Sequence, residues 1–307
     1  MKRSFSPDGV AREVQTLVSD LKLATVCESA RCPNLRECYS QRQLTFMILG
    51  ETCTRSCRFC AVDHGRPAPV AADEPWRVAE AVKRLGLRHV VITSVARDEL
   101  PDEGAGHFVE VLRVIRQQNP HITVEVLVPD FHGRETLIAH VLREGRPNVF
   151  AHNVETIERL SPLLRPQASY QRSLQVLAHA ASLGAGSLMK SSLMVGLGET
   201  QGEIAQTFRD LLHAGVTHLT LGQYLRPDPH HLPVMEYISP ERFATYERLA
   251  YDLGFAWVSA GPFVRSSYHA VDALKAQRGG HERPRNTDQV ADVQTAALHD
   301  HQVIHGN

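Results

Sequence analysis

The chain has 307 residues, and its 33 Lys and Arg residues nearly balance its 34 Asp and Glu residues, which gives a formal charge of −1. With 43% hydrophobic and 22% charged residues, the composition is that of a globular protein and excludes disordered, collagenous and membrane-embedded chains. The balanced charge gives no support for a nucleic-acid partner, and no apolar run approaches the roughly 18 residues of a membrane span.

The N-terminal sequence carries no mark of a targeting segment. Lys2 and Arg3 are followed by no apolar stretch, and the acidic residues Asp8 and Glu13 come early. Neither a secretory signal nor a transit peptide has this composition. We therefore expect a cytoplasmic protein.

Short apolar runs alternate with amphipathic stretches through the middle of the chain. The runs predicted to form strands are residues 44–49, 89–95, 123–128, 149–154, 188–195, 218–224 and 255–259. Apolar residues recur with helical spacing at residues 78–85, 174–181 and 204–212. Thr200 and Glu203 form a capping-box sequence, and Ser239 followed by Pro240 is typical of a helix start. Gly86 and Gly254 stand where two of the predicted helices should end.

Strand–helix alternation of this kind predicts parallel strands joined by crossover helices. The fold class we predict is α/β, a partial TIM-like (β/α)6 barrel over residues 43–272. Residues 1–42 are expected to form an N-terminal extension outside the barrel, and residues 273–307 a polar C-terminal tail. In barrels of this class, reactive groups lie at the carboxyl ends of the strands.

All six cysteines lie between Cys27 and Cys60, and the rest of the chain has none. Disulfides confined to one short segment could not brace the remaining fold, so a disulfide-stapled protein is excluded. In a reducing compartment, clustered thiols more often bind metal or perform redox chemistry.

The second cysteine triad follows the first predicted strand with the spacing C-x3-C-x2-C, at Cys53, Cys57 and Cys60. Three thiolates so close together can bind one iron–sulfur cubane and leave its fourth iron open. A zinc site is the alternative, with His64 as a fourth ligand.

The first triad has the spacing C-x4-C-x5-C, at Cys27, Cys32 and Cys38. It also lacks a fourth cysteine, so each cluster must take its last ligand from another group. Electron-carrier ferredoxins usually complete their cysteine sets, which disfavours a simple carrier.

The C-x3-C-x2-C loop after a first barrel strand, with an aromatic residue before its last cysteine, resembles the radical S-adenosylmethionine superfamily. The C-x4-C-x5-C triad narrows the resemblance to the lipoyl synthase family. The resemblance extends over about residues 20–272, with motifs at residues 31–35, 93–95, 97–98, 152–156, 165–166, 190–200, 222–227 and 264–270.

This resemblance implies two [4Fe-4S] clusters and S-adenosylmethionine as cofactors. S-adenosylmethionine would bind the open iron of the cluster at Cys53, Cys57 and Cys60. The auxiliary cluster at Cys27, Cys32 and Cys38 would be completed by Ser267, with its neighbour Ser266 the less favoured ligand.

Polar side chains on strand ends are further candidates for contacts with S-adenosylmethionine. Asn153 and Glu155 follow one predicted strand, although they could merely cap the next helix. Lys190 lies in an apolar run, where a cofactor carboxylate or an internal salt bridge would pair it. Arg165 could hold a carboxylate, and Arg226 likewise.

The resemblance also implies an activity, the insertion of sulfur at C6 and C8 of a protein-bound octanoyl-lysine, with the auxiliary cluster as sulfur donor. The implied partners are octanoylated lipoyl domains or the glycine-cleavage H protein, an external electron donor, and iron–sulfur cluster assembly or carrier proteins. A local basic patch could receive an acidic partner, with Arg31, Arg36, Arg42, Arg55 and Arg58 as its candidates. The alternatives are a paralogue acting on another acyl substrate and a non-catalytic iron–sulfur or zinc redox sensor.

Overall fold

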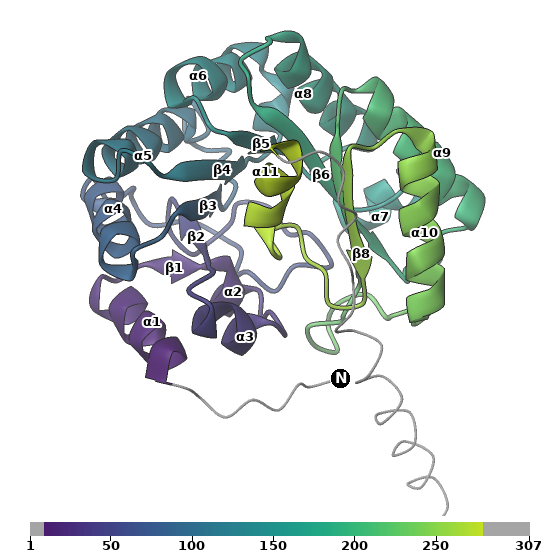
Figure 1. The fold of residues 1–307 in the computed structure, drawn as a ribbon, viewed down its shortest axis with the longest axis horizontal. Helices are drawn as coiled ribbons and strands as arrows, with labels where there is room; N and C mark the ends of the chain where they lie inside the picture. Colours follow the sequence, from purple (N-terminus) through teal and green to yellow (C-terminus); the bar gives the residue numbers. More distant parts are fainter. Residues whose placement is uncertain (1–8, 279–307) are drawn as a thin grey trace, which may run out of the picture.

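The structure, a computed structural model, describes residues 9–278. Within that part of the chain, eight strands form one sheet in the order β1 to β8 (Figure 1). Their bounds are β1 Ala24–Thr25, β2 Thr45–Ile48, β3 His89–Ser94, β4 Thr123–Leu127, β5 Val149–Ala151, β6 Leu188–Val195, β7 His218–Gln223 and β8 Trp257–Gly261. Most of the predicted tail, and all of its histidines, lie outside the described residues.

The strands β2 to β8 are all parallel, and β1 pairs with β2 in the antiparallel direction. One crossover helix joins each successive pair of parallel strands, which confirms the predicted partial barrel. These helices are α4 Glu74–Leu85, α5 Ala105–Gln118, α6 Glu135–Gly145, α8 Tyr170–Ser182, α9 Gln201–His213 and α10 Pro240–Leu253. The short helical turns η1 Phe131–Gly133, η2 Glu158–Leu160 and α7 Ser161–Leu164 lie in the loops.

The predicted signals at helix ends have the expected geometry. Thr200 and Glu203 form a capping box at the start of α9, so two backbone N–H groups without helical partners are satisfied there. The Ser239 side chain accepts a hydrogen bond from the backbone N–H of Arg242 at the start of α10. Gly86 and Gly254 end α4 and α10 in the left-handed conformation.

Alternate strand residues face opposite sides of the sheet. Phe46, Ile92 and Val126 pack in one buried core with apolar residues of α4 and α5. Their neighbours in sequence face the interior of the barrel, where polar side chains such as Thr93 and Lys190 are buried. The helices therefore stabilise the sheet from outside and leave its inner face for polar groups.

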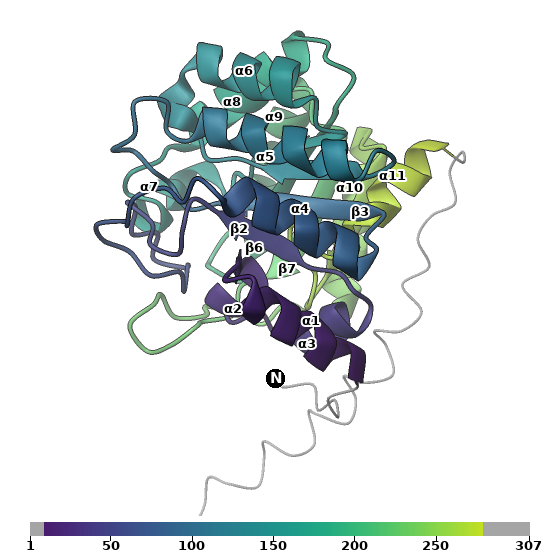
Figure 2. The same ribbon diagram turned by 90° about the vertical axis from the view of Figure 1, so that its left-hand side faces the viewer.

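The N-terminal segment folds against the barrel as α1 Gly9–Asp20, α2 Val26–Ser29 and α3 Leu35–Ser40. The buried side chains of α1 belong to the same core as β2 and α4. At the other end of the chain, α11 Ala270–Arg278 follows β8. In Figure 2, α7 and α11 lie at opposite ends of the barrel, so α11 is at the amino ends of the strands. None of the described helices combines the length and apolar character needed to cross a bilayer.

Candidate functional site

The loop after β2 leaves the sheet abruptly. Leu49 and Gly50 both have positive φ angles, 70° and 94°, which turn the chain away from the strand direction. The backbone N–H of Leu49 donates to Glu74 of α4 at 2.8 Å, and its carbonyl accepts from Arg97 at 2.6 Å. The start of the cysteine loop is thereby fixed between two buried side chains.

Cys53 is held on both its backbone and its sulfur. Its N–H donates to the Asp63 carbonyl at 2.8 Å, and its carbonyl accepts from the Gly65 N–H at 2.9 Å. The Sγ atom accepts hydrogen bonds from the backbone N–H groups of Arg55 at 3.4 Å and Ala96 at 3.3 Å. Backbone donors in these positions suit the sulfur of an iron-bound thiolate.

Arg55 anchors the cysteine loop to the ends of two neighbouring strands. Its guanidinium lies 2.7 Å from Asp98, which follows β3, and 2.7 Å from Asp130, which follows β4. The Arg55 side chain is only 6% exposed. The prediction that Arg55 belongs to a basic surface patch is therefore wrong, because its charge is used inside the fold.

Cys57 and Cys60 are half-buried, and the carboxylate of Glu155 lies near both. Burial, together with neighbouring negative groups, raises the pKa of the Cys57 thiol to about 12 and that of Cys60 to about 11. Without a metal both thiols hold their protons at neutral pH, so binding of iron must release them.

Asn153, Glu155 and Arg165 form one group beside Cys57. The Asn153 amide donates to Glu155 at 3.0 Å, and Arg165 donates to the Asn153 carbonyl at 3.1 Å. Two buried atoms of this group, Asn153 Oδ1 and Arg165 Nε, have no hydrogen-bond partner. Buried polar atoms are rarely left unpaired, so these two atoms suit a polar ligand.

Glu155 has an unusual backbone conformation, with φ of 65°. Its N–H donates to the Ser192 carbonyl, and its carbonyl accepts from Met194, both in β6. The predicted strand over 149–154 therefore ends at Ala151, because the chain turns to bring Glu155 against β6. A non-glycine residue in this region is costly and is often found at functional sites.

The turn after β6 requires glycine at position 196. Gly196 has φ of 97°, and a Cβ atom there would lie 2.2 Å from the Gln223 side chain and 2.4 Å from the Glu236 carbonyl. The Glu199 carboxylate accepts from the Gly196 and Leu197 N–H groups. The turn is thus packed against the loop that follows β7.

Lys190 has an internal partner. Its ammonium lies 2.8 Å and 3.1 Å from the two carboxylate oxygens of Glu125 in β4, and both side chains are 1% exposed. The internal salt bridge, one of the two interpretations open from the sequence, is what the structure contains. Because its charge is already paired, we do not retain Lys190 among the proposed cofactor contacts.

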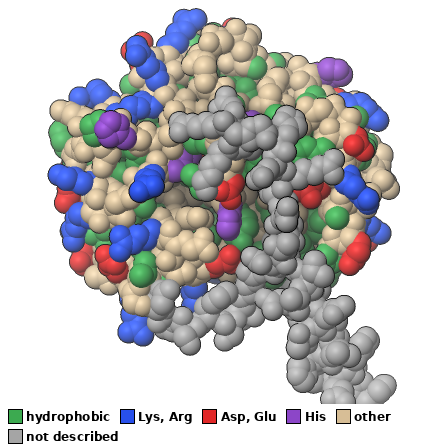
Figure 3. All heavy atoms as spheres, viewed as in Figure 1, with side chains coloured by type: hydrophobic (Ala, Val, Ile, Leu, Met, Phe, Trp, Pro, Cys, Tyr) green, Lys and Arg blue, Asp and Glu red, His purple; other side chains and the backbone are tan. Residues whose placement is uncertain are grey.

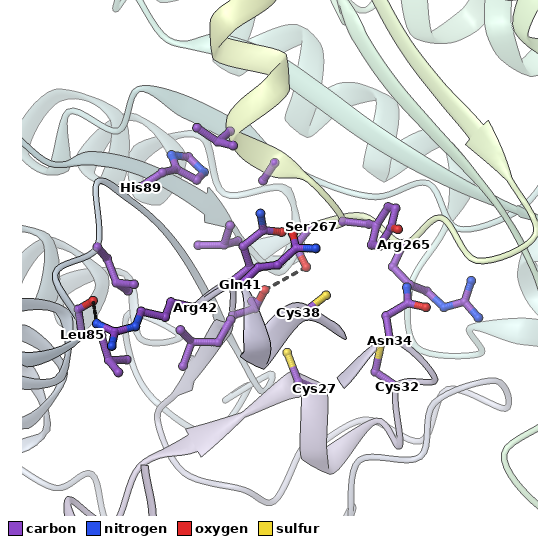
Figure 4. Close-up of a pocket in the computed structure, with 18 of the residues that line it drawn as sticks. Cys27, Cys32, Asn34, Cys38, Gln41, Arg42, Leu85, His89, Arg265 and Ser267 are labelled. Atoms are coloured by element: carbon purple, nitrogen blue, oxygen red, sulfur yellow. Dashed lines mark hydrogen bonds between the residues drawn. The ribbon is translucent and has the colours of Figure 1, made fainter. Parts of the chain in front are cut away.

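The upstream triad and Ser267 line one cavity of about 310 Å³ (Figure 4). Cys27 lies in α2, Cys38 in α3, and Cys32 between these helices. Ser267 follows β8 and accepts a hydrogen bond from Thr45 at 2.8 Å. Four side chains predicted to act together, from opposite ends of the chain, therefore meet at one cavity. Ser266 is not among the residues that line it.

Two long-range hydrogen bonds join the N-terminal and C-terminal segments at this cavity. The Asn34 amide donates to the Phe263 carbonyl at 2.6 Å, and the Tyr268 hydroxyl donates to Glu37 at 2.9 Å. Both bonds flank Ser267 in the fold, so they fix the serine relative to α2 and α3.

The auxiliary thiols also resist ionisation. Burial raises the pKa of Cys27 to about 12 and raises the pKa of Cys32 and Cys38 above its usual range. As at the other triad, iron must displace the protons.

The spacing of the sulfurs bears on the zinc alternative. Within residues 9–278, the only three ligand atoms of Cys, His, Asp or Glu that lie within 4.8 Å of one another belong to Asp98, Glu103 and His132. Sulfurs bound to one tetrahedral zinc at about 2.3 Å must be closer than that. Neither triad has this compact arrangement, whereas a cubane binds each thiolate to a different iron.

Several residues of the site were missed from the sequence. Asp98 and Asp130 hold Arg55, Glu125 holds Lys190, and the His231 ring nitrogens lie 2.9 Å from the Cys60 carbonyl and 2.8 Å from Asp228. Two sequence signals point to them: Asp98 lies in the family motif at residues 97–98, and both Asp98 and Asp130 closely follow predicted strands.

Comparisons with known proteins place these features in a family. The sequence profile of the radical SAM superfamily matches residues 47–211. Lipoyl synthase of Rubrobacter xylanophilus is 54% identical over 275 residues, covering 89% of this chain and 85% of that protein. Lipoyl synthase of Caldanaerobacter subterraneus subsp. tengcongensis is 51% identical over 266 residues, covering 87% of this chain and 93% of that protein.

Solved structures share the fold at low sequence identity. Methylornithine synthase has a TM-score of 0.52 at 13% identity, and the match covers 93% of this chain and 96% of that one. Streptococcus suis SuiB bound to S-adenosylmethionine has a TM-score of 0.52 at 12% identity. That match covers 72% of this chain but only about half, 51%, of SuiB. These likenesses support the barrel fold alone.

Proposed function

Because the chain belongs to the lipoyl synthase family, within the radical S-adenosylmethionine superfamily, we propose that it converts a protein-bound octanoyl-lysine into the lipoyl cofactor by inserting sulfur at C6 and C8. The meeting of Cys27, Cys32, Cys38 and Ser267 at one cavity is the observation that carries this proposal. A second cluster site is what a sulfur donor separate from the radical-generating cluster would need.

The loop after β2 suits the first [4Fe-4S] cluster and S-adenosylmethionine. Cys53, Cys57 and Cys60 would bind three irons, and the fourth would take the cofactor. The unpartnered atoms Asn153 Oδ1 and Arg165 Nε would bind its polar groups, and Glu155 would offer a carboxylate beside them. The donor set therefore fits the cofactor that this superfamily uses.

The second cavity suits the auxiliary [4Fe-4S] cluster. Cys27, Cys32 and Cys38 would supply soft thiolates, and Ser267 a hard oxygen ligand. An oxygen ligand is readily replaced on iron, which suits a cluster that is taken apart during turnover. Thr45, which donates to Ser267, would keep the serine oxygen oriented in the cavity.

When bound, the two clusters and S-adenosylmethionine supply the reducing electron, the 5′-deoxyadenosyl radical that abstracts hydrogen, and the sulfur atoms. The chain's own contribution is to position and shield these groups. Arg55 holds the cysteine loop on β3 and β4, and the N–H groups of Arg55 and Ala96 bind the Cys53 sulfur. Cys57 and Cys60 are partly shielded from solvent in the same loop.

The proposed function implies partners. These are an octanoylated lipoyl domain or the glycine-cleavage H protein as substrate, an external electron donor, and assembly or carrier proteins that rebuild the auxiliary cluster. A cytoplasmic location stays a prediction.

The direct experiment is anaerobic incubation of the reconstituted protein with S-adenosylmethionine, a strong reductant and an octanoyl-lysine peptide. We expect 5′-deoxyadenosine together with a peptide that has gained two sulfur atoms. Formation of 5′-deoxyadenosine with an unaltered peptide would favour a paralogue with another acyl substrate. Absence of both products, with zinc in place of iron and sulfide, would favour a redox sensor.

A further inference from the structure

The cavity lined by the auxiliary triad extends beyond the four residues proposed to bind the cluster. Cys27, Cys32, Cys38 and Ser267 lie toward one end, and Arg42, Leu85 and His89 lie toward the other (Figure 4). A cluster bound by the three thiols would fill only the sulfur end. The rest of the cavity could therefore hold a second ligand.

The far part of the cavity is largely apolar. Apolar side chains line it from the residue before β2, the end of α4, the α4–β3 connection, β3 and α11, namely Leu44, Leu85, Leu87, Val91, Ala270 and Val271. Such a lining is favourable for an alkyl chain, since each buried CH2 group contributes about 0.8 kcal/mol. An acyl chain seated here would end beside the sulfur ligands.

The cavity meets solvent at the amino ends of the strands. Gln41, Arg42, Gly86 and Arg88 line it and are exposed. The cysteine loop after β2 lies at the opposite, carboxyl ends of the strands. A substrate entering here would approach the auxiliary cluster without crossing the site of S-adenosylmethionine.

The rim of this opening is basic. Arg42 and Arg88 line it, and the exposed Lys83 and Arg84 lie in the last turn of α4 beside it. None of the described residues that line the cavity is acidic, although Glu13 pairs with Arg42 at 3.1 Å. Figure 3 shows Lys and Arg side chains over α4 and toward α1, among fewer acidic ones. The whole chain is nearly neutral, so this basic surface is local.

His89 adds a polar contact inside the opening. Its Nδ1 atom lies 2.9 Å from the Thr123 hydroxyl, and its buried Nε2 atom has no hydrogen-bond partner. An alkyl chain attached to lysine carries an amide, which must find a partner when it leaves water. His89 Nε2 can serve that amide at the cavity wall.

We propose that the octanoyl chain enters through this opening at the amino ends of the strands, and that the acidic surface of its carrier protein docks on Lys83, Arg84 and Arg88. The proposal rests on the proposed function, because it takes octanoyl-lysine as the substrate. It adds the route of entry and the surface that selects a negatively charged carrier.

The docking surface is tested by equilibrium binding, which needs no turnover. Fluorescence anisotropy would measure the Kd of a labelled, acidic octanoylated carrier domain for the reconstituted protein at low salt. We expect the Arg84→Glu/Arg88→Glu variant to bind at least about tenfold more weakly, with a smaller salt dependence. Arg248→Glu, a matched charge reversal on α10, should keep the wild-type Kd within about twofold.

Equal carrier binding by wild type and the double variant would overturn the docking surface. So would a loss of self-association in the double variant, seen by light scattering, with carrier binding unchanged, because the surface would then serve a second copy of this chain. A wild-type protein that binds the carrier through these arginines but forms no lipoyl product would contradict the proposed function and not the docking surface.

The route of entry is tested by filling the opening. Leu87→Trp, or the milder Leu87→Phe, places a larger side chain in the apolar wall. We expect the affinity for an octanoyl-lysine peptide to fall at least about fivefold in Leu87→Trp and less in Leu87→Phe. Iron and sulfide content would verify that both clusters still form. If Leu87→Trp contains both clusters and still binds the octanoyl-lysine peptide with wild-type affinity, the proposed route of entry is wrong.

Discussion

Arg55 shows how one side chain can determine the position of a cofactor loop. It stands between two cysteines in sequence, yet its guanidinium reaches the ends of β3 and β4 through Asp98 and Asp130. Asp130 is 1% exposed and also binds Arg172 at 3.1 Å. The loop is thus connected to the barrel by a buried network of charges, in which each member depends on the others.

Replacing Arg55 by methionine should destabilise the fold strongly. The change leaves two carboxylates without their main partner, and breaking a buried pair costs about 3–5 kcal/mol. Urea unfolding of the metal-free protein would measure this loss. Arg248→Met, at an exposed site on α10, is the matched control and should change the free energy of unfolding by less than about 0.5 kcal/mol. Equal stability of the two variants would contradict the role given to Arg55.

The same network predicts a pH dependence. Burial acts to raise the pKa of Asp98 and Asp130, but hydrogen bonds and charge from Arg55 outweigh it, and both pKa values lie below the usual range. Their contribution is present above the unfolded pKa of about 4 and is lost as pH falls through the folded pKa. The difference in unfolding free energy between wild type and Arg55→Met should therefore narrow below about pH 4. A difference that stays constant with pH would show that it does not come from the ionised Asp98 and Asp130.

Ser267 is the residue on which the auxiliary cluster most depends. In Ser267→Ala the cavity keeps its three thiols but loses the oxygen ligand, so we expect the yield of thiolated peptide to fall at least about tenfold. Formation of 5′-deoxyadenosine, which depends on the other cluster, should persist. Ser266→Ala is the control. A larger loss of thiolated peptide in Ser266→Ala than in Ser267→Ala would show that Ser266, and not Ser267, is the ligand.

At the scale of elements, the parallel strands and crossover helices could be predicted because their signals are local. Periodic apolar residues, the capping box at Thr200 and the glycines that end α4 and α10 each act within a few residues. The short elements β1 and α3 have no such signal, and α2 has only a cap at its start, where the Thr25 hydroxyl accepts a hydrogen bond from the Glu28 N–H. They form because β1 pairs with β2 and α3 packs against α1, and such contacts are not visible in a sequence pattern.

The turn between β6 and α9 is the element most sensitive to a small substitution. Gly196→Ala would force a Cβ atom against the Gln223 side chain and the Glu236 carbonyl and would strain the positive φ. We expect a loss of about 1–3 kcal/mol in the free energy of unfolding. Gly202→Ala, where a Cβ atom meets nothing closer than 4.0 Å, should change it by less than about 1 kcal/mol. Thermal unfolding would compare the two variants. Equal unfolding midpoints would contradict the conclusion that the turn at Gly196 has no room for a Cβ atom.

At the scale of the whole molecule, both ends of the described chain close on one side of the barrel. Asn34 binds the Phe263 carbonyl and Tyr268 binds Glu37, partners that are 229 and 231 residues apart in sequence. The auxiliary site therefore exists only when the barrel has brought both segments together. The cysteine spacing predicts the triads, and family resemblance predicts Ser267. The closing contacts follow from neither, because no short-range pattern encodes them.

The site beside the cysteine loop could likewise be predicted only in part from the sequence. Asn153 and Glu155 could be selected because they follow a strand, and Arg165 because of the family resemblance. The pairing of Lys190 with Glu125 could not be foreseen, since these residues are 65 positions apart on strands separated by β5. A buried charge in a sequence indicates that a partner exists, but only the fold identifies that partner.

The source of the inserted sulfur is the most direct test of the account. Protein reconstituted with heavy-isotope sulfide would be given S-adenosylmethionine, reductant and an octanoyl-lysine peptide for a single turnover, and the product would be weighed by mass spectrometry. We predict that both inserted sulfur atoms carry the label, and that Cys27→Ala forms 5′-deoxyadenosine without thiolated peptide. Unlabelled sulfur in the product, or full product from Cys27→Ala, would contradict the assignment of this cavity as the sulfur donor.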